Sequence, residues 1–102
     1  MGDLNLVPFS KGEPINTNNA AVTAYKRGSV VMVSVNGLNA SEAYITGLPT
    51  PYNEMFTNAS MLDGNLNGIN GFFRYLPESD NFLIRRTSGS DSMYGTLTYL
   101  TA

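Results

Sequence analysis

The clearest feature of the hydrophobic pattern is one run of six residues, Val30-Val31-Met32-Val33-Ser34-Val35, of which five are apolar. β-Branched residues favour strands, and alternate side chains of a strand point to opposite faces. Val31, Val33 and Val35 therefore share one face and predict a core, while Val30 and Met32 share the other. A strand that is apolar on both faces needs cover on both sides, and a chain of 102 residues has little mass to supply it. The second face predicts cover by another subunit or by an overhang of a second sheet.

The remainder of the chain has the rhythm of short strands separated by Gly, Pro, Asn, Asp and Ser. Residues 54–62 form the one plausible helical turn. Phe82 and Ile84 are expected to face inward. Apolar residues share one face of two other strands, and Leu100 falls on the opposite face of the last one: these residues are Ile69, Gly71, Phe73 and Tyr75, and then Leu97 and Tyr99. The expected strands are 21–25, 30–35, 43–46, 69–76, 82–86 and 94–101, with a short one within 4–9.

This pattern predicts an all-β fold, a single antiparallel β-sandwich or small β-barrel, jelly-roll-like, of six to eight short strands. Residues 1–19 are rich in Gly, Pro and Asn and are interpreted as a lead-in strand and linker, a remnant of a neck. Residues 20–102 are expected to form the β domain, and the length fits one domain.

Charge and composition narrow the class of partner. Six Lys/Arg against eight Asp/Glu give a net charge of −2, which argues against nucleic acid because nucleic acid attracts basic surfaces. No stretch approaches the roughly 18 apolar residues of a membrane span, so no membrane insertion is expected. Charged residues make up 14%, and Asn, Ser, Thr and Gly supply the polarity instead. Such a surface suits an extracellular or virion protein, a sugar binder, or any turn-rich β domain.

The chain has no His and no Cys, which removes the common acid–base switch, the Ser-His and Cys-His nucleophile pairs and the soft-metal sites. A glycosidase needs two carboxylates facing each other across a cleft. The available carboxylates lie scattered through turns, and no apolar run surrounds any of them. A non-enzymatic protein without a cofactor is therefore expected. These carboxylates are Glu42, Glu54, Asp63, Glu78, Asp80 and Asp91.

The segment Asp63-Gly64-Asn65-Leu66-Asn67-Gly68 matches the front half of a Ca²⁺-binding loop, with oxygen ligands at alternate positions and Gly at the sixth. The twelfth position, where a bidentate Glu belongs, is Arg74. The main interpretation is a turn that uses Asp, Asn and Gly for left-handed backbone, with no metal site. A weak Ca²⁺ site at Asp63, Asn65 and Asn67 is the alternative.

Aromatic and polar side chains gather near several turns, and this mixture is typical of saccharide sites. An aromatic ring packs under the C–H face of a sugar, while Asp, Asn and Arg bond its hydroxyls. The same composition is also common on sandwich edges. The candidate saccharide-binding residues are Tyr52, Phe56, Asn58, Asp80, Asn81, Arg85 and Tyr94.

Arg86 breaks the alternation of its strand, because it falls on the same face as Phe82 and Ile84. It lies at a strand end, in a bulge, or paired in a subunit interface. The candidate oligomer-interface residues are Val30, Met32 and Arg86.

In chain order, Lys26-Arg27-Gly28-Ser29 leads into the valine run, and Gly47-Leu48-Pro49 with Pro51-Tyr52 follows. Then come Gly68-Ile69-Asn70-Gly71-Phe72-Phe73, a strand over 81–85, and a closing Gly95-Thr96-Leu97-Thr98-Tyr99-Leu100. This arrangement, over about residues 20–102, resembles the C-terminal head domain of receptor-binding (baseplate or tail-fibre) proteins of siphophages that infect Gram-positive bacteria.

The resemblance implies a trimeric β head that adheres to host cell-wall saccharide at the phage tail tip, outside the cell, together with other tail or baseplate proteins. Family heads commonly bind sugar with Trp, His, Asp and Arg, and this chain has neither Trp nor His. Asp80 and Arg85 are the positions that fill comparable roles. The expected function is a non-enzymatic adhesin head that works as a homotrimer. The alternative is a structural virion or tail-assembly module that binds another protein.

Overall fold

The computed structural model describes residues 12–53, 56–89 and 92–101, and within these ranges the secondary structure is β throughout. Eight antiparallel strands form one curled sheet in the order β1-β2-β3-β8-β5-β6-β7-β4. The expected fold class, a small β-sandwich or barrel, is confirmed. No helix among the described residues is long and apolar enough to span a membrane. The strands are β1 (Glu13–Ile15), β2 (Val22–Arg27), β3 (Val30–Leu38), β4 (Glu42–Ile45), β5 (Phe56–Leu62), β6 (Gly68–Leu76), β7 (Asn81–Arg86) and β8 (Met93–Leu100).

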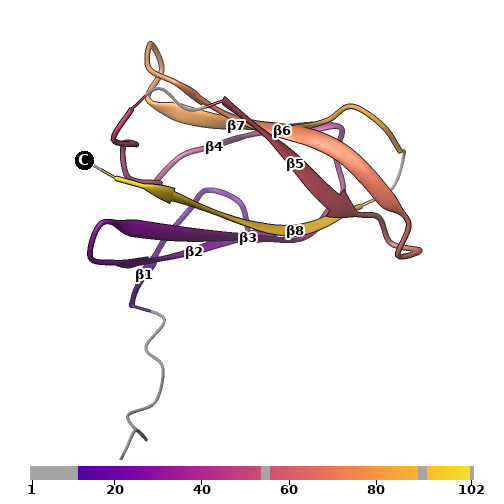
Figure 1. The fold of residues 1–102 in the computed structure, drawn as a ribbon, viewed down its shortest axis with the longest axis horizontal. Coiled ribbons are helices and arrows are strands. Elements are labelled where there is room, and N and C mark those ends of the chain that lie inside the picture. The colour runs from indigo at the N-terminus through magenta and orange to yellow at the C-terminus, as the bar shows by residue number, and fades with distance from the viewer. Residues whose placement is uncertain (1–11, 54–55, 90–91, 102) are drawn as a thin grey trace, which may run out of the picture.

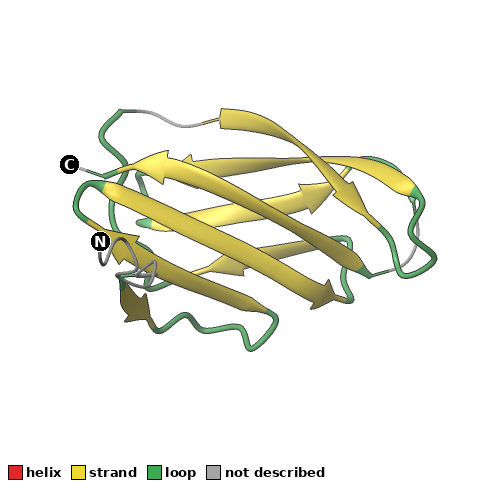
Figure 2. Cartoon of the chain, turned by 60° about the horizontal axis from the view of Figure 1, so that its bottom comes forward, coloured by secondary structure: helices red, strands yellow, loops and turns green. Residues whose placement is uncertain are grey.

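The sheet folds over into two facing layers, as Figures 1 and 2 show. One layer contains β1, β2, β3 and β8, and the other contains β5, β6, β7 and β4. Strand β5 runs diagonally from one layer toward the other and meets β8 at its end (Figure 1). In the described part of the chain, a single residue pair, Leu62 with Tyr94, registers β5 on β8. This pair forms the corner of the sandwich.

The valine run behaves as its pattern predicts. Val31, Val33 and Val35 on β3 are buried, while Val30 and Met32 are 43% and 41% exposed on the outer face. The inward assignment in β7 is also confirmed, since Phe82 and Ile84 are buried, and the shared apolar face of β6 is the buried one at Ile69 and Phe73. The core therefore lies between the two layers. Its buried apolar residues are Val22, Ala24, Val31, Val33, Val35, Leu38, Ile45, Leu48, Met61, Ile69, Phe73, Phe82, Ile84, Met93 and Tyr99.

Aromatic rings join the two layers at the centre of the core. The ring of Tyr99 on β8 lies 5.4 Å from that of Phe82 on β7, and Phe82 also contacts Phe73 at 5.2 Å. Tilted rings at these separations attract each other beyond their burial of area. The Tyr99 hydroxyl donates a hydrogen bond to the Pro49 carbonyl at 2.7 Å, which holds the loop before β5 against the core.

The prediction of a helical turn over 54–62 is wrong, because residues 56–62 form strand β5, which pairs with β6 from Phe56–Arg74 to Leu62–Gly68. Ala59 and Met61 point toward the core, and this burial outweighs a weak local helical preference. Residues 54–55 lie outside the described residues.

The sheet also begins earlier than residue 20, the expected start of the domain. Strand β1 pairs with β2 through Pro14–Tyr25 and its neighbours, and Asn18 contacts β4. The expected strand within 4–9 lies outside the described residues.

The two edge strands are closed to further pairing in different ways. The Asn36 N–H donates to the Ala21 carbonyl, so every second residue of β2 bonds to β3 and the residues between them bond to β1. By this alternation the backbone nitrogen of Pro14 faces away from β2, at the open edge of the sheet. Proline has no N–H to offer there. At the β4 edge, the Asn18 side chain donates to the Tyr44 carbonyl at 3.1 Å and accepts from the Thr46 N–H at 3.0 Å. One amide thus replaces part of a missing strand.

Candidate functional site

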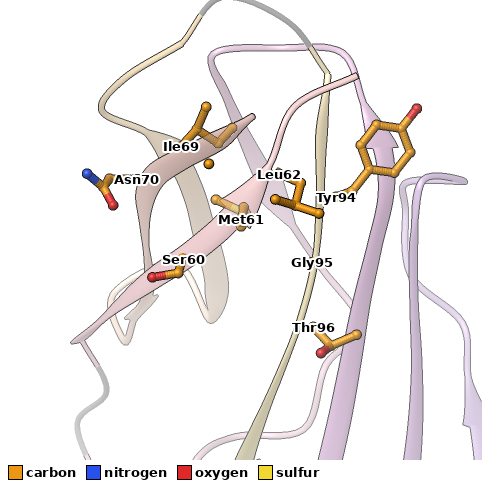
Figure 3. Close-up of a pocket in the computed structure, with 9 residues that line it drawn as sticks. Ser60, Met61, Leu62, Ile69, Asn70, Tyr94, Gly95 and Thr96 are labelled. Atoms are coloured by element: carbon orange, nitrogen blue, oxygen red, sulfur yellow. The ribbon is translucent and has the colours of Figure 1, made fainter. Parts of the chain in front are cut away.

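A shallow groove of about 590 Å³ lies at the corner where β5, β6 and β8 meet. Its hydrophobic floor comes from Met61 and Ile69, whose side chains are buried. Figure 3 shows Ser60 and Asn70 projecting from β5 and β6 on one side, while the Tyr94 ring projects away from them on the other. None of the lining residues is acidic or basic. They are Ser60, Met61, Leu62, Gly68, Ile69, Asn70, Tyr94, Gly95 and Thr96.

The groove offers hydrogen-bonding groups from side chains. Within the described residues, no hydrogen bond occupies the side chains of Ser60, Asn70 or Thr96. Two hydroxyls and one amide are therefore available to a ligand as donors and acceptors.

Backbone groups face the same opening. The Asp63 N–H donates to the Asn67 carbonyl, which makes 63–67 a bonded pair of the β5–β6 ladder. Bonded pairs alternate, so the N–H and C=O of Ser60 point away from β6 and toward β8. The Thr101 N–H donates to the Ser29 carbonyl, which makes these two residues a bonded pair of the β3–β8 ladder. By the same alternation, the N–H and C=O of Thr96 point away from β3 and toward β5.

Asn70 is held firmly at the groove. Its N–H donates to the Ser88 hydroxyl at 2.9 Å, and its carbonyl accepts from the Thr87 N–H at 2.8 Å and from the Thr87 hydroxyl at 3.2 Å. The three bonds fix the backbone, so the side-chain amide projects from a rigid position.

Two glycines keep the groove open. A Cβ at Gly68 would meet nothing within 4 Å, so any side chain there would extend into open space. A Cβ at Gly95 would lie 2.9 Å from the Met61 Cγ, and its absence lets Met61 lie across β8.

A bulge in β3 shapes the border of the groove. The register between β3 and β8 shifts between Asn36 and Leu38, and Gly37 has a φ of +76°. The Tyr94 hydroxyl oxygen lies 3.4 Å from the position of a Cβ on Gly37. The Tyr94 ring therefore lies at ordinary contact distance over Gly37, and the positive φ of the bulge is what favours glycine there.

The structure does not gather the seven predicted saccharide residues at one place. Tyr94 borders the groove, and Asn58 on β5 lines an adjacent hollow of about 300 Å³. Arg85 on β7 pairs with Glu42 at 3.8 Å, away from the groove. The side chain of Phe56 lies outside the described residues.

The other three predicted residues belong to the opposite end of the sandwich. Asp80, with a φ of +51°, accepts a hydrogen bond from the Tyr75 hydroxyl at 2.8 Å, and this bond raises the pKa of Tyr75. Asn81 begins β7 beside Asp80, and its Oδ1 accepts from the Ser79 hydroxyl. Tyr52 is exposed, and its N–H donates to the Leu100 carbonyl.

The loop after β5 is a turn organised by its own aspartate. Asp63 is almost fully buried, and its Oδ1 accepts from the N–H groups of Asn65 and Asn67, each at 2.9 Å. The Asp63 Oδ1, one of the oxygens of the alternative Ca²⁺ site, is thus already occupied by hydrogen bonds within the turn. In the part of the chain that the structure describes, no group of three carboxylate, His or Cys side chains could hold a metal ion.

The predicted interface residues separate into two settings. Val30 and Met32 lie on the outer face of β3, close to Leu100 on β8, which pairs with Val30. Arg86 is half-buried at the end of β7, and its N–H donates to the Ser41 carbonyl. Arg86 is the last residue of β7, and this position accounts for a charged side chain on the face that Phe82 and Ile84 occupy.

Sequence reasoning missed Ser60, Asn70 and Thr96. Their one signal is that each occupies the outward position of a strand next to the Asp63–Gly68 turn or next to Tyr94. The outward positions on β5 can be identified only once β5 is known to be a strand.

A scan against protein-family models, a search of curated proteins and a search of solved structures each found no match to this chain.

Proposed function

We propose that this chain is a non-enzymatic, saccharide-binding head of a phage tail adhesin and that it acts at the tail tip on host cell-wall saccharide. The observation that carries the proposal is the uncharged groove, in which the Ser60 and Thr96 hydroxyls and the Asn70 amide have no partner among the described residues. Sugars are recognised by paired hydrogen bonds to such groups together with apolar contact to their C–H surfaces. Met61, Leu62 and Ile69 supply the apolar contact.

Binding without catalysis agrees with the positions of the carboxylates. Glu42 lies beside Arg85, Asp63 organises a turn, and Asp80 accepts from Tyr75. None of these three lines the groove. A glycoside hydrolase needs two carboxyl groups facing one bond across a cleft.

We propose further that the head is a homotrimer whose subunits meet through the outer face of β2, β3 and β8. The exposed Val30 and Leu100 pair across the strands of this face, and Met32 lies two residues along β3. Among the described outward residues of these three strands, Arg27 alone is charged, whereas the other layer exposes Glu42, Arg74 and Arg85. Because the described part of this face carries a single charged residue, identical copies approach it with little like-charge repulsion, and association through either edge strand is opposed by Pro14 and by the Asn18 cap.

The saccharide-binding test uses Gram-positive cell walls and a groove-blocking variant. Gly68→Gln fills the open space at Gly68, where nothing lies within 4 Å of an added Cβ, without contact to the core. We expect the unmodified chain to sediment with the walls and Gly68→Gln to lose at least about tenfold in affinity. The matched control is Asp80→Asn, at the opposite end of the sandwich, which should bind normally. Equal binding by Gly68→Gln, or loss of binding only in Asp80→Asn, contradicts the assignment of the groove.

One observation favours the alternative function, a structural virion module that binds another protein. Leu66 is 77% exposed at the tip of the turn organised by Asp63 and has a φ of +66°. Backbone strain that persists at an exposed apolar residue favours a functional role for that residue, and under this alternative Leu66 is the anchor for the partner. Under this alternative, Leu66→Asn abolishes incorporation into tails while Gly68→Gln leaves it unchanged.

A further inference from the structure

The groove does not end at Asn70. The adjacent hollow of about 300 Å³ shares Ser60 and Asn70 with the groove and continues over β5, β6 and the residue after β7. The two hollows adjoin at these shared residues, and together we call them the track. The hollow adds Asn58, Ala59, Gly71 and Thr87 to the lining.

Four polar residues follow each other across four neighbouring segments of the track. Ser60 on β5 is the register partner of Asn70 on β6, and Thr87 bonds the Asn70 carbonyl. Paired strands lie about 4.8 Å apart, so the row from Ser60 through Asn70 to Thr87 extends for roughly 10 Å across the strands. Thr96 on β8 lies across the groove from Ser60, beyond the one registered pair of β5 and β8 among the described residues, Leu62 with Tyr94.

We propose that the track binds an internal stretch of an extended, uncharged glycan chain rather than a single terminal sugar. This inference rests on the proposed saccharide-binding function. A terminal sugar is typically held in a closed pocket, whereas the track is shallow and its two hollows adjoin at Ser60 and Asn70. A chain lying along it meets hydroxyl or amide groups at each step, from Thr96 through Ser60 and Asn70 to Thr87.

The charge of the lining selects the chemical class. No Lys or Arg lines either hollow, so a phosphate-bearing or carboxylate-bearing polymer would find no counter-charge there. An extended peptide is a poorer fit, because a peptide that adds as a strand would pair with the backbone groups of Ser60 and Thr96 between β5 and β8 and would leave Asn58 and Thr87 of the far hollow unused. The hydroxyls of a neutral glycan match the available amide and hydroxyl groups.

The experiment measures how affinity depends on ligand length. Neutral polysaccharide is purified from a cell wall that the chain binds and is cut by partial acid hydrolysis into fragments graded from a single sugar to long oligomers. Calorimetry then gives the affinity of each fragment. We expect affinity to rise by about tenfold or more with length until the track is filled, and then to level off.

Two variants separate the ends of the track from its centre. Asn58→Ala and Thr87→Val, in one chain, remove polar groups from the far hollow, and thermal unfolding checks that the variant is folded. We expect this variant to bind long fragments about tenfold more weakly and single sugars unchanged. Asn70→Ala, at the shared centre, should weaken both.

The outcomes distinguish this inference from the function on which it rests. Equal affinity for single sugars and long fragments overturns the track and leaves saccharide binding intact. Preference for a phosphate-bearing wall polymer over the neutral one also overturns it. Failure to bind any wall fragment contradicts the proposed function itself.

Discussion

At the scale of single residues, Asn18 closes one open edge of the sheet with a side chain. Its amide group replaces a neighbouring strand by bonding both the Tyr44 carbonyl and the Thr46 N–H. Close packing accompanies these bonds, since a Cβ at Gly47 would lie 2.2 Å from the Asn16 carbonyl oxygen. The segment after β1 is therefore fitted against β4 and is part of the folded domain.

We expect Asn18→Ala to lower the free energy of unfolding by about 1 kcal/mol, because two partly solvated hydrogen bonds are lost. Denaturant unfolding followed by circular dichroism measures the change. Asn53→Ala is the control, because Asn53 is exposed in a loop. This variant should have the same free energy of unfolding as the unmodified chain. An equal loss in the two variants would mean that the Asn18 bonds contribute nothing specific.

Tyr99 gives the stability of the fold a dependence on alkaline pH. Burial raises the pKa of Tyr99 above its ordinary value of about 10, so the folded state keeps the phenol proton after the unfolded state has released it. This contribution to stability is complete below about pH 10 and is lost as the pH rises above it.

The variant Tyr99→Phe cannot titrate at this position. It should be less stable at neutral pH by about 1 kcal/mol, because the bond to the Pro49 carbonyl is lost. Above about pH 10 its stability should fall less steeply with pH than that of the unmodified chain. Unfolding at several pH values measures both slopes, and identical slopes would refute the assignment.

At the scale of elements, β6 and β7 lie close together because Gly71 has no side chain. A Cβ at this position would lie 2.5 Å from the Arg85 carbonyl oxygen and 2.6 Å from the Met61 Cε. A glycine is therefore required by the packing of β5, β6 and β7.

We expect Gly71→Ala to destabilise the fold by about 1–3 kcal/mol, since the strands must shift to admit a methyl group. Gly68→Ala at the start of the same strand is the matched control, because nothing lies within 4 Å of an added Cβ there. Thermal unfolding of both variants checks the prediction. A destabilised Gly68→Ala would show that glycine is needed in β6 for reasons other than packing.

The strands with strict alternation could be predicted from the sequence. Val31, Val33 and Val35 define β3, and Phe82 and Ile84 define the inward face of β7, because burial of one face imposes a period of two. Strand β5 could not be predicted, because its apolar residues also fit a helical turn and its pairing with β6 decided between the two. The groove could not be predicted for the same reason, because Ser60, Asn70 and Thr96 come together only where β5 joins β8 at Leu62 and Tyr94.

At the scale of the whole molecule, the two outer faces differ in character. The face of β2, β3 and β8 exposes Val30, Met32 and Leu100, whereas the face of the other layer carries charged side chains. This asymmetry is the physical basis of the proposed trimer.

We expect Met32→Glu to shift the protein from trimer to monomer, because three buried carboxylates would meet at the seam. Tyr44→Glu, at a comparably exposed position on the other layer, is the control and should remain trimeric. Light scattering coupled to gel filtration at micromolar concentration gives the mass of each. A monomeric unmodified chain contradicts the proposal, as does dissociation by Tyr44→Glu alone.

The pairing of β3 with β8 has a consequence for synthesis of the chain on the ribosome. Strands β4 to β7 emerge before β8 and make their own hairpins, β5–β6 and β6–β7, with partners already at hand. The valine run of β3 meanwhile has β2 on one side and an unpaired edge on the other. Nascent chains are therefore most prone to associate with one another in this interval, and a chaperone that binds apolar strands would protect them until β8 arrives.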